Sequence, residues 1–531
     1  MQIVNPKIHL RDYSPKIKLQ EGRIVNPDEV ICAAAGITFK DVRHFSDVLR
    51  KIQLGDYGEG DEEEYRKLMK GLVNSAGAGH ASLSTGIDLT ISAEDSTSKF
   101  IDSMFTGARF ESALMPSGRR VPIKEDQILV PKSIKSAGNE AVQIYMKNSK
   151  ENIRAYEKLK ERGVHKQQAS KIVQYGLTGG GFIKIPLETL VSFSRDFKFN
   201  PNAIPQEGKE ILSQLEEMVY ENGMTITYEA RKASPRATCP NPSIFHYRKT
   251  SAEELRDENS ENLIIVDTYS RDSLDRKNRI YKWLKKFKEV SKSKDLTKKQ
   301  HEQLLQEAHE IVQDHNQDVR ASVFSVSPWR VWGEYKRHRT MPQEAESIYQ
   351  ARKRISPIVQ RIIENKKDGL GPNLRELERV FSLPEEIKED FENLNIWINR
   401  IVDSNNTFEK LKEIGIPESD AIYVFPRGLK LGVFRTYDTY NLTTGFESLR
   451  RCKDVEPEMK KTTWQEYELL QSSNLPQDIK DFMRVKCQYT GFCHNRSPCK
   501  NIYSVASWYS PEEHESFQSE MTQEILRRTK L

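Results

Sequence analysis

The stretch that decides the fold is Ser325-Val-Ser-Pro-Trp-Arg-Val-Trp-Gly-Glu-Tyr-Lys-Arg-His-Arg339. Residues 321–326, which lead into it, are rich in β-forming side chains and predict a strand. Ser327 is a favoured helix cap, and Pro328 suits the first helical position, where its missing N–H costs nothing. The predicted helix ends in three nitrogen-rich side chains, called here the basic triplet: Arg337, His338 and Arg339. Cations at a helix C-terminus are favoured by the helix dipole, and three together can also form an anion-binding rim.

The basic triplet and the following Ser347 resemble the signature of the flavin-dependent thymidylate synthases, R-H-R-x-x-S-x-N-E-x-S-x-R-Y. The match is partial. Pro342 stands where the first serine belongs, and Tyr349 stands where the arginine belongs. Glu344 and Ala345 replace the Asn-Glu pair of the signature.

A second copy of this strand–helix unit lies 230 positions earlier in the chain. Residues 87–92 predict its strand and residues 96–105 its helix. Aligned without a gap, Arg109 falls on Arg339 and Ser117 falls on Ser347. The earlier copy has Ser112, Ser117 and Arg119 at signature positions, and the later copy lacks the first and the last of these; Gly107 and Ala108 replace the first arginine and the histidine. His80 matches the Gly-His that begins the family's preceding segment.

Two further segments resemble the family in the later half. Residues 163–176 resemble residues 415–426, and both resemble a family segment in which an arginine contacts the nucleotide. Lys171 could supply that cation in the first copy, and Ile422 cannot in the second. Residues 438–458 resemble a nucleotide-binding segment, with Arg450 at the position of the phosphate-binding arginine. Arg451 follows it directly, so the sequence leaves open which of the two points inward.

The resemblance implies an α+β fold built as two tandem repeats, each a small mixed or antiparallel sheet packed with long helices. The repeats are expected at residues 1–235 and 263–475. A linker rich in Pro, Ser and charge is expected at residues 236–262, and a cysteine-containing extension at residues 476–531.

The resemblance also implies a reaction, the methylation of dUMP to dTMP. Methylenetetrahydrofolate would be the carbon donor, NADPH the reductant and FAD the hydride carrier. It assigns FAD binding to Arg337, His338, Arg339 and His80, nucleotide binding to Arg109, Ser112, Ser117, Arg119, Ser347 and Arg450, and a catalytic role to Arg450. Family members are homotetramers, so we expect the chain to pair with itself into a pseudo-tetramer. The alternative is an inactive paralogue that binds flavin or nucleotide, or a structural partner of an active enzyme.

Composition narrows the other possibilities. The 531 residues predict at least two domains. With 82 basic and 77 acidic residues, the net charge of +5 is too even to argue for nucleic acid. The basic run of residues 282–299 is interleaved with acidic residues, so we interpret it as a solvated helix face. We recognise neither a secretory signal nor an apolar run that could span a membrane, and we expect a cytoplasmic protein.

The C-terminal extension carries Cys487, Cys493, His494 and Cys499. Five residues separate successive cysteines, which lacks the C-x-x-C pair of common structural zinc sites. We therefore expect reduced thiols in a small loop domain and no bound metal, with a zinc site as the alternative.

Overall fold

The computed structural model describes residues 2–529 except 19–23, 40–60, 95, 106, 109, 117–120, 235–240, 292–296, 365–370, 492, 494, 496, 504–505 and 507–508. These residues form two compact units, and each unit is discontinuous in sequence. The first unit holds residues 1–249, 328–339 and 346–431, and the second holds residues 250–327, 340–345 and 432–531. The compact units therefore cut across the linear order in which the repeats are expected, and the repeat bounds stay a prediction.

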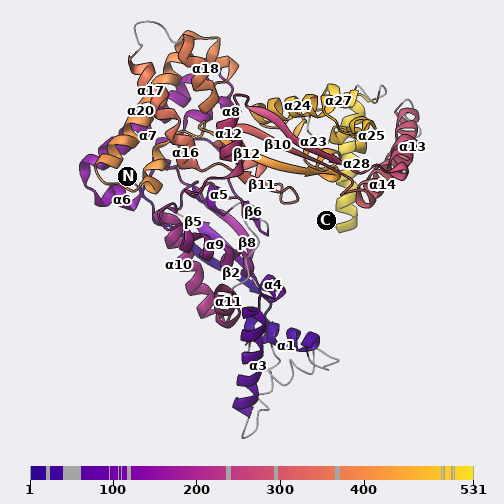
Figure 1. The fold of residues 1–531 in the computed structure, drawn as a ribbon, viewed down its shortest axis with the longest axis horizontal. Coiled ribbons are helices and arrows are strands. Elements are labelled where there is room, and N and C mark those ends of the chain that lie inside the picture. The colour runs from indigo at the N-terminus through magenta and orange to yellow at the C-terminus, as the bar shows by residue number, and fades with distance from the viewer. Residues whose placement is uncertain are drawn as a thin grey trace. The chain divides into compact units, whose positions relative to one another are not determined.

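The first unit is built on a four-stranded antiparallel sheet of strand order β2-β5-β8-β6. Its strands are β2 (Lys7–Ser14), β5 (Asp88–Glu94), β6 (Ser112–Leu114) and β8 (Gly181–Pro186). Leu89, Ile91 and Ala93 of β5 are buried, as period-2 alternation requires of a strand with one face in the core. Helices α9 (Leu187–Phe199) and α10 (Gln206–Glu221) run beside this sheet (Figure 1) and contribute to the same core.

The remaining elements of the first unit are mostly helical. Near the N-terminus and around the sheet they are β1 (Gln2–Ile3), β3 (Ile17–Lys18), β4 (Ile24–Val25), α1 (Pro27–Phe39), α3 (Asp61–Gly77), α4 (Ala81–Thr85), α5 (Ile101–Met104), β7 (Leu129–Val130), α6 (Lys132–Ser136), α8 (Lys166–Ala169) and α11 (Thr225–Ala233). From later in the chain come α15 (Trp329–Tyr335), α16 (Ile348–Lys353), α17 (Ile355–Glu364), α18 (Gly371–Val380), α19 (Glu385–Lys388) and α21 (Glu418–Ala421).

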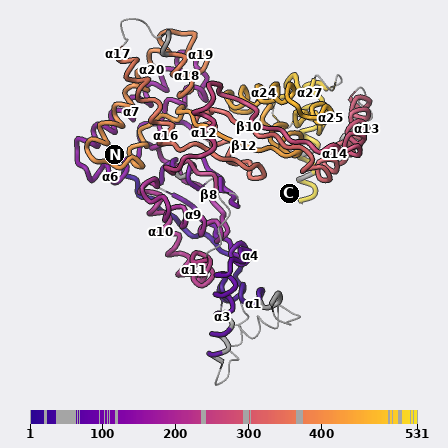
Figure 2. The backbone as a smooth tube through the Cα atoms, viewed as in Figure 1, coloured from indigo at the N-terminus to yellow at the C-terminus, as the bar shows by residue number. Residues whose placement is uncertain are grey.

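The two longest helices of the first unit lie side by side, as Figure 2 shows. They are α7 (Asn139–Glu161) and α20 (Phe391–Glu413), each of 23 residues. Their contact is partly polar: the Asn152 Nδ2 atom donates to Ser404 Oγ at 3.3 Å and to Gln174 Oε1 at 3.4 Å, and all three residues are buried. Because buried polar groups need partners, these bonds help to fix how the two helices pack.

The second unit is built on another four-stranded sheet, of order β11-β12-β10-β9. Its strands are β9 (Leu263–Ser270), β10 (Val319–Pro328), β11 (Gln343–Ala345) and β12 (Lys430–Asp438). The strand order equals that of the first sheet when β2, β5, β8 and β6 are matched with β9, β10, β12 and β11. The α+β class is therefore confirmed, and both sheets share one topology.

Helices complete the second unit. They are α12 (Ser251–Glu258), α13 (Leu274–Val290), α14 (Thr297–Asp314), α22 (Thr439–Leu442), α23 (Phe446–Arg450), α24 (Pro457–Ser472), α25 (Gln477–Phe482), α26 (Lys486–Thr490), α27 (Lys500–Tyr503) and α28 (Pro511–Thr529). Within the described residues of both units, no helix combines the length and apolar character needed to cross a membrane.

Two local expectations were wrong. Pro328 ends β10 and takes the cap position of α15, so Ser327 is not the cap. The helix expected at residues 96–105 shrinks to α5, because the segment before it is extended. Its backbone pairs with a neighbouring segment, since Ser98 bridges Thr178 and the Lys99 N–H donates to the Leu177 carbonyl at 2.7 Å.

Candidate functional site

The basic triplet follows α15 in the first unit. Arg337 and Arg339 are exposed and His338 is half-buried. The His338 N–H donates to the Tyr335 carbonyl at 3.0 Å, which continues the last turn of the helix. The guanidinium groups therefore stand at the negative end of a short helix, where cations are stabilised.

The earlier copy of the motif meets the basic triplet through Glu111. Its carboxylate accepts a hydrogen bond from Arg339 in an ion pair, and the Gly107 N–H donates to the same oxygen at 3.3 Å. The Glu111 side chain is only 1% exposed, whereas that of Arg339 is 35% exposed. Within the described residues the second oxygen of Glu111 has no hydrogen-bond partner. The structure thus brings the two motif copies together around one buried carboxylate.

Gly107 and Lys336 form the other contact between the copies. Gly107 has a φ of +124°, and a Cβ atom there would lie 2.9–3.1 Å from three side-chain carbons of Lys336. Lys336 is 2% exposed, and its ammonium lies 4.9 Å from the centroid of the Trp332 ring. A side chain at position 107 would push against this lysine, so the glycine permits the close approach of the two segments.

The other residues predicted for the earlier copy are only partly described. Ser112 is exposed on β6, next to Glu111, and so belongs to the same neighbourhood. His80 is exposed at the cap position of α4, where its side chain makes no capping bond. Arg109, Ser117 and Arg119 lie outside the described residues.

Ser347, predicted to contact the nucleotide, is buried and bonded to the backbone. Its hydroxyl donates to the His246 carbonyl and accepts from the Tyr349 N–H, which caps α16. Lys171 is also buried, and its ammonium donates to Gln168 Oε1 at 2.5 Å. The structure gives Ser347 a helix-capping role that the sequence reading did not anticipate.

The choice between Arg450 and Arg451 is settled within the second unit. Arg451 is the one that points inward: it is 2% exposed, with its guanidinium carbon 4.1 Å from the centroid of the Tyr467 ring. Its Nε atom lies 3.7 Å from a carboxylate oxygen of Glu447. Arg450 is half-buried at the end of α23, so it retains access to solvent.

A second buried ion pair lies beside it in the second unit. Arg435 donates to the carboxylate of Glu466 and to Ser325 Oγ, and both members of the ion pair are fully buried. Burial raises the pKa of Glu447 well above its usual value, and the neighbouring Glu466 adds to the effect. The sequence reading missed these carboxylates, because they match no signature position. Glu466 thus pairs with Arg435, and Glu447 lies beside Arg451.

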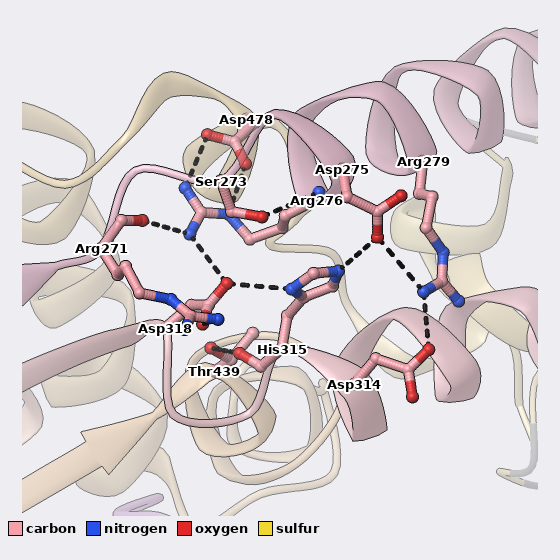
Figure 3. A network of polar contacts seen from close by, with 10 residues as sticks. All are labelled: Arg271, Ser273, Asp275, Arg276, Arg279, Asp314, His315, Asp318, Thr439 and Asp478. Atoms are coloured by element: carbon pink, nitrogen blue, oxygen red, sulfur yellow. Dashed lines mark hydrogen bonds and ion pairs between the residues drawn. The ribbon is translucent and has the colours of Figure 1, made fainter.

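A third cluster of polar side chains connects helices of the second unit (Figure 3). The His315 ring lies between two carboxylates, with Nδ1 2.9 Å from Asp318 and Nε2 3.0 Å from Asp275. Arg276 is fully buried and donates to Asp478 at 2.8 Å and to the Arg271 carbonyl at 2.8 Å. Every group in it faces another side chain or the backbone, so we interpret this cluster as structural.

A small cavity in the first unit is lined by none of the predicted site residues. Its volume is about 10 Å³, and it is lined by Val4, Pro131, Lys132, Gln206, Glu207, Glu210, Asp420 and Tyr423. Burial raises the pKa of Glu207 and of Asp420. Three carboxyl groups against one lysine make a poor site for a phosphorylated ligand.

Comparisons with known proteins agree with the sequence motifs. Residues 258–475 match the model of the thymidylate synthase complementing protein family. The flavin-dependent thymidylate synthase of Pyrococcus horikoshii is 28% identical over 126 residues, which are 23% of this chain and 51% of that relative. The chain therefore spans about half the length of the curated relative it matches.

Solved structures of low identity are also similar to this chain. A flavin-dependent thymidylate synthase from Helicobacter pylori, complexed with FAD and dUMP, is 16% identical with a TM-score of 0.28, covering 42% of this chain and 98% of its own. The UMP/dUMP methylase PolB from Streptomyces cacaoi, bound with 5-Br dUMP, is 13% identical with a TM-score of 0.32, covering 45% and 100%. Residues 258–475, which include the basic triplet, are thus similar to the thymidylate synthase complementing protein family.

Proposed function

We propose that this chain methylates dUMP to dTMP, with methylenetetrahydrofolate as carbon donor, NADPH as reductant and FAD as hydride carrier. The observation that carries the proposal is the match of residues 258–475 to the family, because this segment contains the basic triplet and Arg450. The meeting of both motif copies at Glu111 supports it, since it adds residues of the earlier copy to the same neighbourhood.

The residues of the first unit suit a flavin with phosphate groups. Arg337 and Arg339 offer two exposed guanidinium groups, which bind phosphate in a bidentate manner, and His338 lies between them. Glu111 holds Arg339 from its buried side and so orients it. In this proposal the triplet and His80 hold FAD, which supplies the hydride chemistry when bound.

Nucleotide binding falls to the other predicted residues, Arg109, Ser112, Ser117, Arg119, Ser347 and Arg450. Arg450 binds the nucleotide and stabilises the charge that develops on the pyrimidine. Arg451 is buried beside Glu447, whereas Arg450 is half-buried and so reaches the solvent.

The same proposal includes a tandem origin for the chain. The shared strand order of the two sheets supports it. So do hydrogen bonds that recur about 252 positions apart within the first unit. The Tyr145 hydroxyl donates to the Leu129 carbonyl at 2.7 Å, and Trp397 Nε1 donates to the Ser382 carbonyl at 3.0 Å.

Backbone bonds recur at the same spacing. The Leu129 N–H donates to the Gly176 carbonyl at 3.0 Å, and the Ser382 N–H donates to the Gly428 carbonyl at 2.8 Å. Unrelated segments would not repeat both a side-chain and a backbone bond in this register. We further expect two chains to associate, so that four repeats assemble as in the family.

An inactive, ligand-binding paralogue is the second candidate. Two observations favour it: the Ser347 hydroxyl is occupied in capping α16, and the Asn-Glu pair of the signature is replaced by Glu344 and Ala345. Such a protein would bind flavin or dUMP without turning the nucleotide over.

Flavin content after purification tests FAD binding, and a turnover assay distinguishes the enzyme from the inactive paralogue. The wild-type chain should be yellow or take up FAD. Arg337→Ala and Arg339→Ala should each weaken the affinity for FAD by at least about tenfold, because a charge-assisted contact contributes about 1.5–3 kcal/mol. Arg154→Ala is the matched control, since Arg154 is an exposed arginine of the first unit that pairs only with surface glutamates.

Release of tritium from dUMP labelled at carbon 5 then tests catalysis. Release that requires FAD, methylenetetrahydrofolate and NADPH supports the enzyme. Binding of dUMP without release favours the inactive paralogue, and a colourless chain that takes up no FAD contradicts both flavin-binding assignments.

A further inference from the structure

Four cysteines gather in the second unit, and one of them comes from a distant part of the sequence. Cys487 lies in α26, Cys493 in the loop after it, Cys499 directly before α27, and Cys452 two residues after the end of α23. All four are in the thiol form. The sequence suggests only the last three as a group, because Cys452 precedes Cys487 by 35 positions.

Specific contacts hold these cysteines in one neighbourhood. Asn495, between Cys493 and Cys499, donates from Nδ2 to the Cys452 sulfur at 3.0 Å. Cys487 packs against the small apolar cluster that contains Cys493. Helix α26 packs against α27, and Gln488 Nε2 reaches the Asn501 carbonyl at 3.5 Å. The loop of Cys493 is therefore tied to Cys452 on one side and to the two short helices on the other.

The cysteines are also close enough to affect one another's pKa. Burial is the largest cause that raises the pKa of Cys487 to about 12, and Cys493, Cys499 and Cys452 contribute to the same rise. Burial likewise raises the pKa of Cys493, with the same sign of effect from Cys499 and Cys452. A bound divalent metal stabilises several thiolates at once.

The apolar cluster around Cys493 is small in the part of this segment that the structure describes. It has four buried members, Cys493, Ile502, Ala506 and Tyr509, with Cys487 and Phe517 packed against it. Segments with so little core commonly rely on a metal or disulfides. Lysines adjoin three of the cysteines, as Lys453, Lys486 and Lys500, and would offset the net negative charge of a metal with four thiolates.

We propose that Cys452, Cys487, Cys493 and Cys499 together bind one zinc ion as a tetrahedral structural site. Binding converts four thiols to thiolates and releases their four protons to solvent. Among the described residues, no three His, Cys, Asp or Glu side chains already stand at metal-ligand spacing. Metal binding is coupled to local folding, so the sulfurs close around the ion when it binds. Asn495 then donates to a ligand sulfur, as groups around a metal site commonly do.

The test uses the full chain purified without chelators. The expected result is one zinc per chain by elemental analysis. Exchange for cobalt(II) should produce the thiolate charge-transfer absorption of a tetrahedral sulfur site. Cys452→Ser and Cys493→Ser should each reduce bound zinc to background, whereas Cys32→Ala, which removes a buried thiol of the first unit, should retain it.

His494 lies outside the described residues, and His494→Ala separates it from Cys452 as a ligand. Retention of zinc in His494→Ala and its loss in Cys452→Ser support the four-cysteine site; the reverse pattern overturns it. If a ligand variant fails to fold, the cobalt spectrum of the wild-type chain still decides. A wild-type chain that holds neither zinc nor cobalt, holds iron instead, or has its cysteines in disulfides by thiol titration also overturns the proposal.

Discussion

At the scale of single residues, buried carboxylates lie against several of the arginines. Glu111 forms an ion pair with Arg339, and Glu466 forms one with Arg435. Glu447 lies beside Arg451. Each sits at a position that the family signature leaves unspecified, so a motif search passes over it. Cationic motif residues are easy to recognise in a sequence. The acidic partners that neutralise them become visible only when distant segments are packed together.

Asp196 provides a test of charge burial at this scale. Burial raises its pKa from 3.8 to about 6. A carboxyl group whose pKa is raised in the folded state binds a proton there that the unfolded chain has lost, so stability falls as pH rises from about 4 to about 6. Asp196→Asn removes this titration. The variant should match wild type near pH 3.5 and be more stable at pH 7 by up to about 3 kcal/mol, the equivalent of roughly two pKa units.

Urea unfolding of both proteins across this pH range measures the difference. Asp126→Asn serves as the control, because Asp126 is exposed and its substitution should leave the difference near zero. A difference between Asp196→Asn and wild type that does not change with pH would contradict the assignment.

At the scale of elements, patterns of apolar residues located strands well and helices less well. The strands expected at residues 87–92 and 321–326 correspond to β5 and β10. The helix expected at residues 96–105 did not form over its full length, because the Lys99 N–H bonds to the Leu177 carbonyl. That partner is 78 positions away, and local propensity carries no information about it. The same limit explains why the sequence does not predict that the Ser347 hydroxyl caps α16.

The cluster around His315 makes a prediction about how helices of the second unit are held (Figure 3). Arg276 joins α13 to Asp478 of α25 and lies 3.5 Å from Asp318, which is 3% exposed. Arg276→Met should reduce the free energy of unfolding by about 3–5 kcal/mol, because removing one partner leaves buried carboxylates uncompensated.

Arg279→Met is the matched control on the same helix. Arg279 pairs with Asp314 and Asp275, whose side chains are 56% and 68% exposed. Loss of the Arg279 side chain should lower the free energy of unfolding by less than about 1 kcal/mol, as for surface ion pairs. Equal losses for the two variants in chemical denaturation would show that the cluster does not hold these helices.

At the scale of the whole molecule, the two compact units do not coincide with the two expected repeats. The first unit takes in residues 328–339 and 346–431, which belong to the later half of the chain. Sequence repetition can reveal that a unit was doubled, but it does not reveal which copy's helices complete which core. Here α20 of the later half packs against α7 of the earlier half through Asn152 and Ser404.

This arrangement predicts the behaviour of a chain cut between residues 240 and 241. Neither fragment contains the whole first unit, so each should be poorly soluble alone, and the two should co-purify when expressed together. Asn152→Asp places a charge at a position with no exposed surface and should prevent co-purification, because burying an unpaired charge is costly. Lys147→Asp, at an exposed position on the same helix, should not. If each fragment folds as a soluble monomer and the two do not co-purify, the halves are independent. The contact between α7 and α20 would then not be needed for the fold.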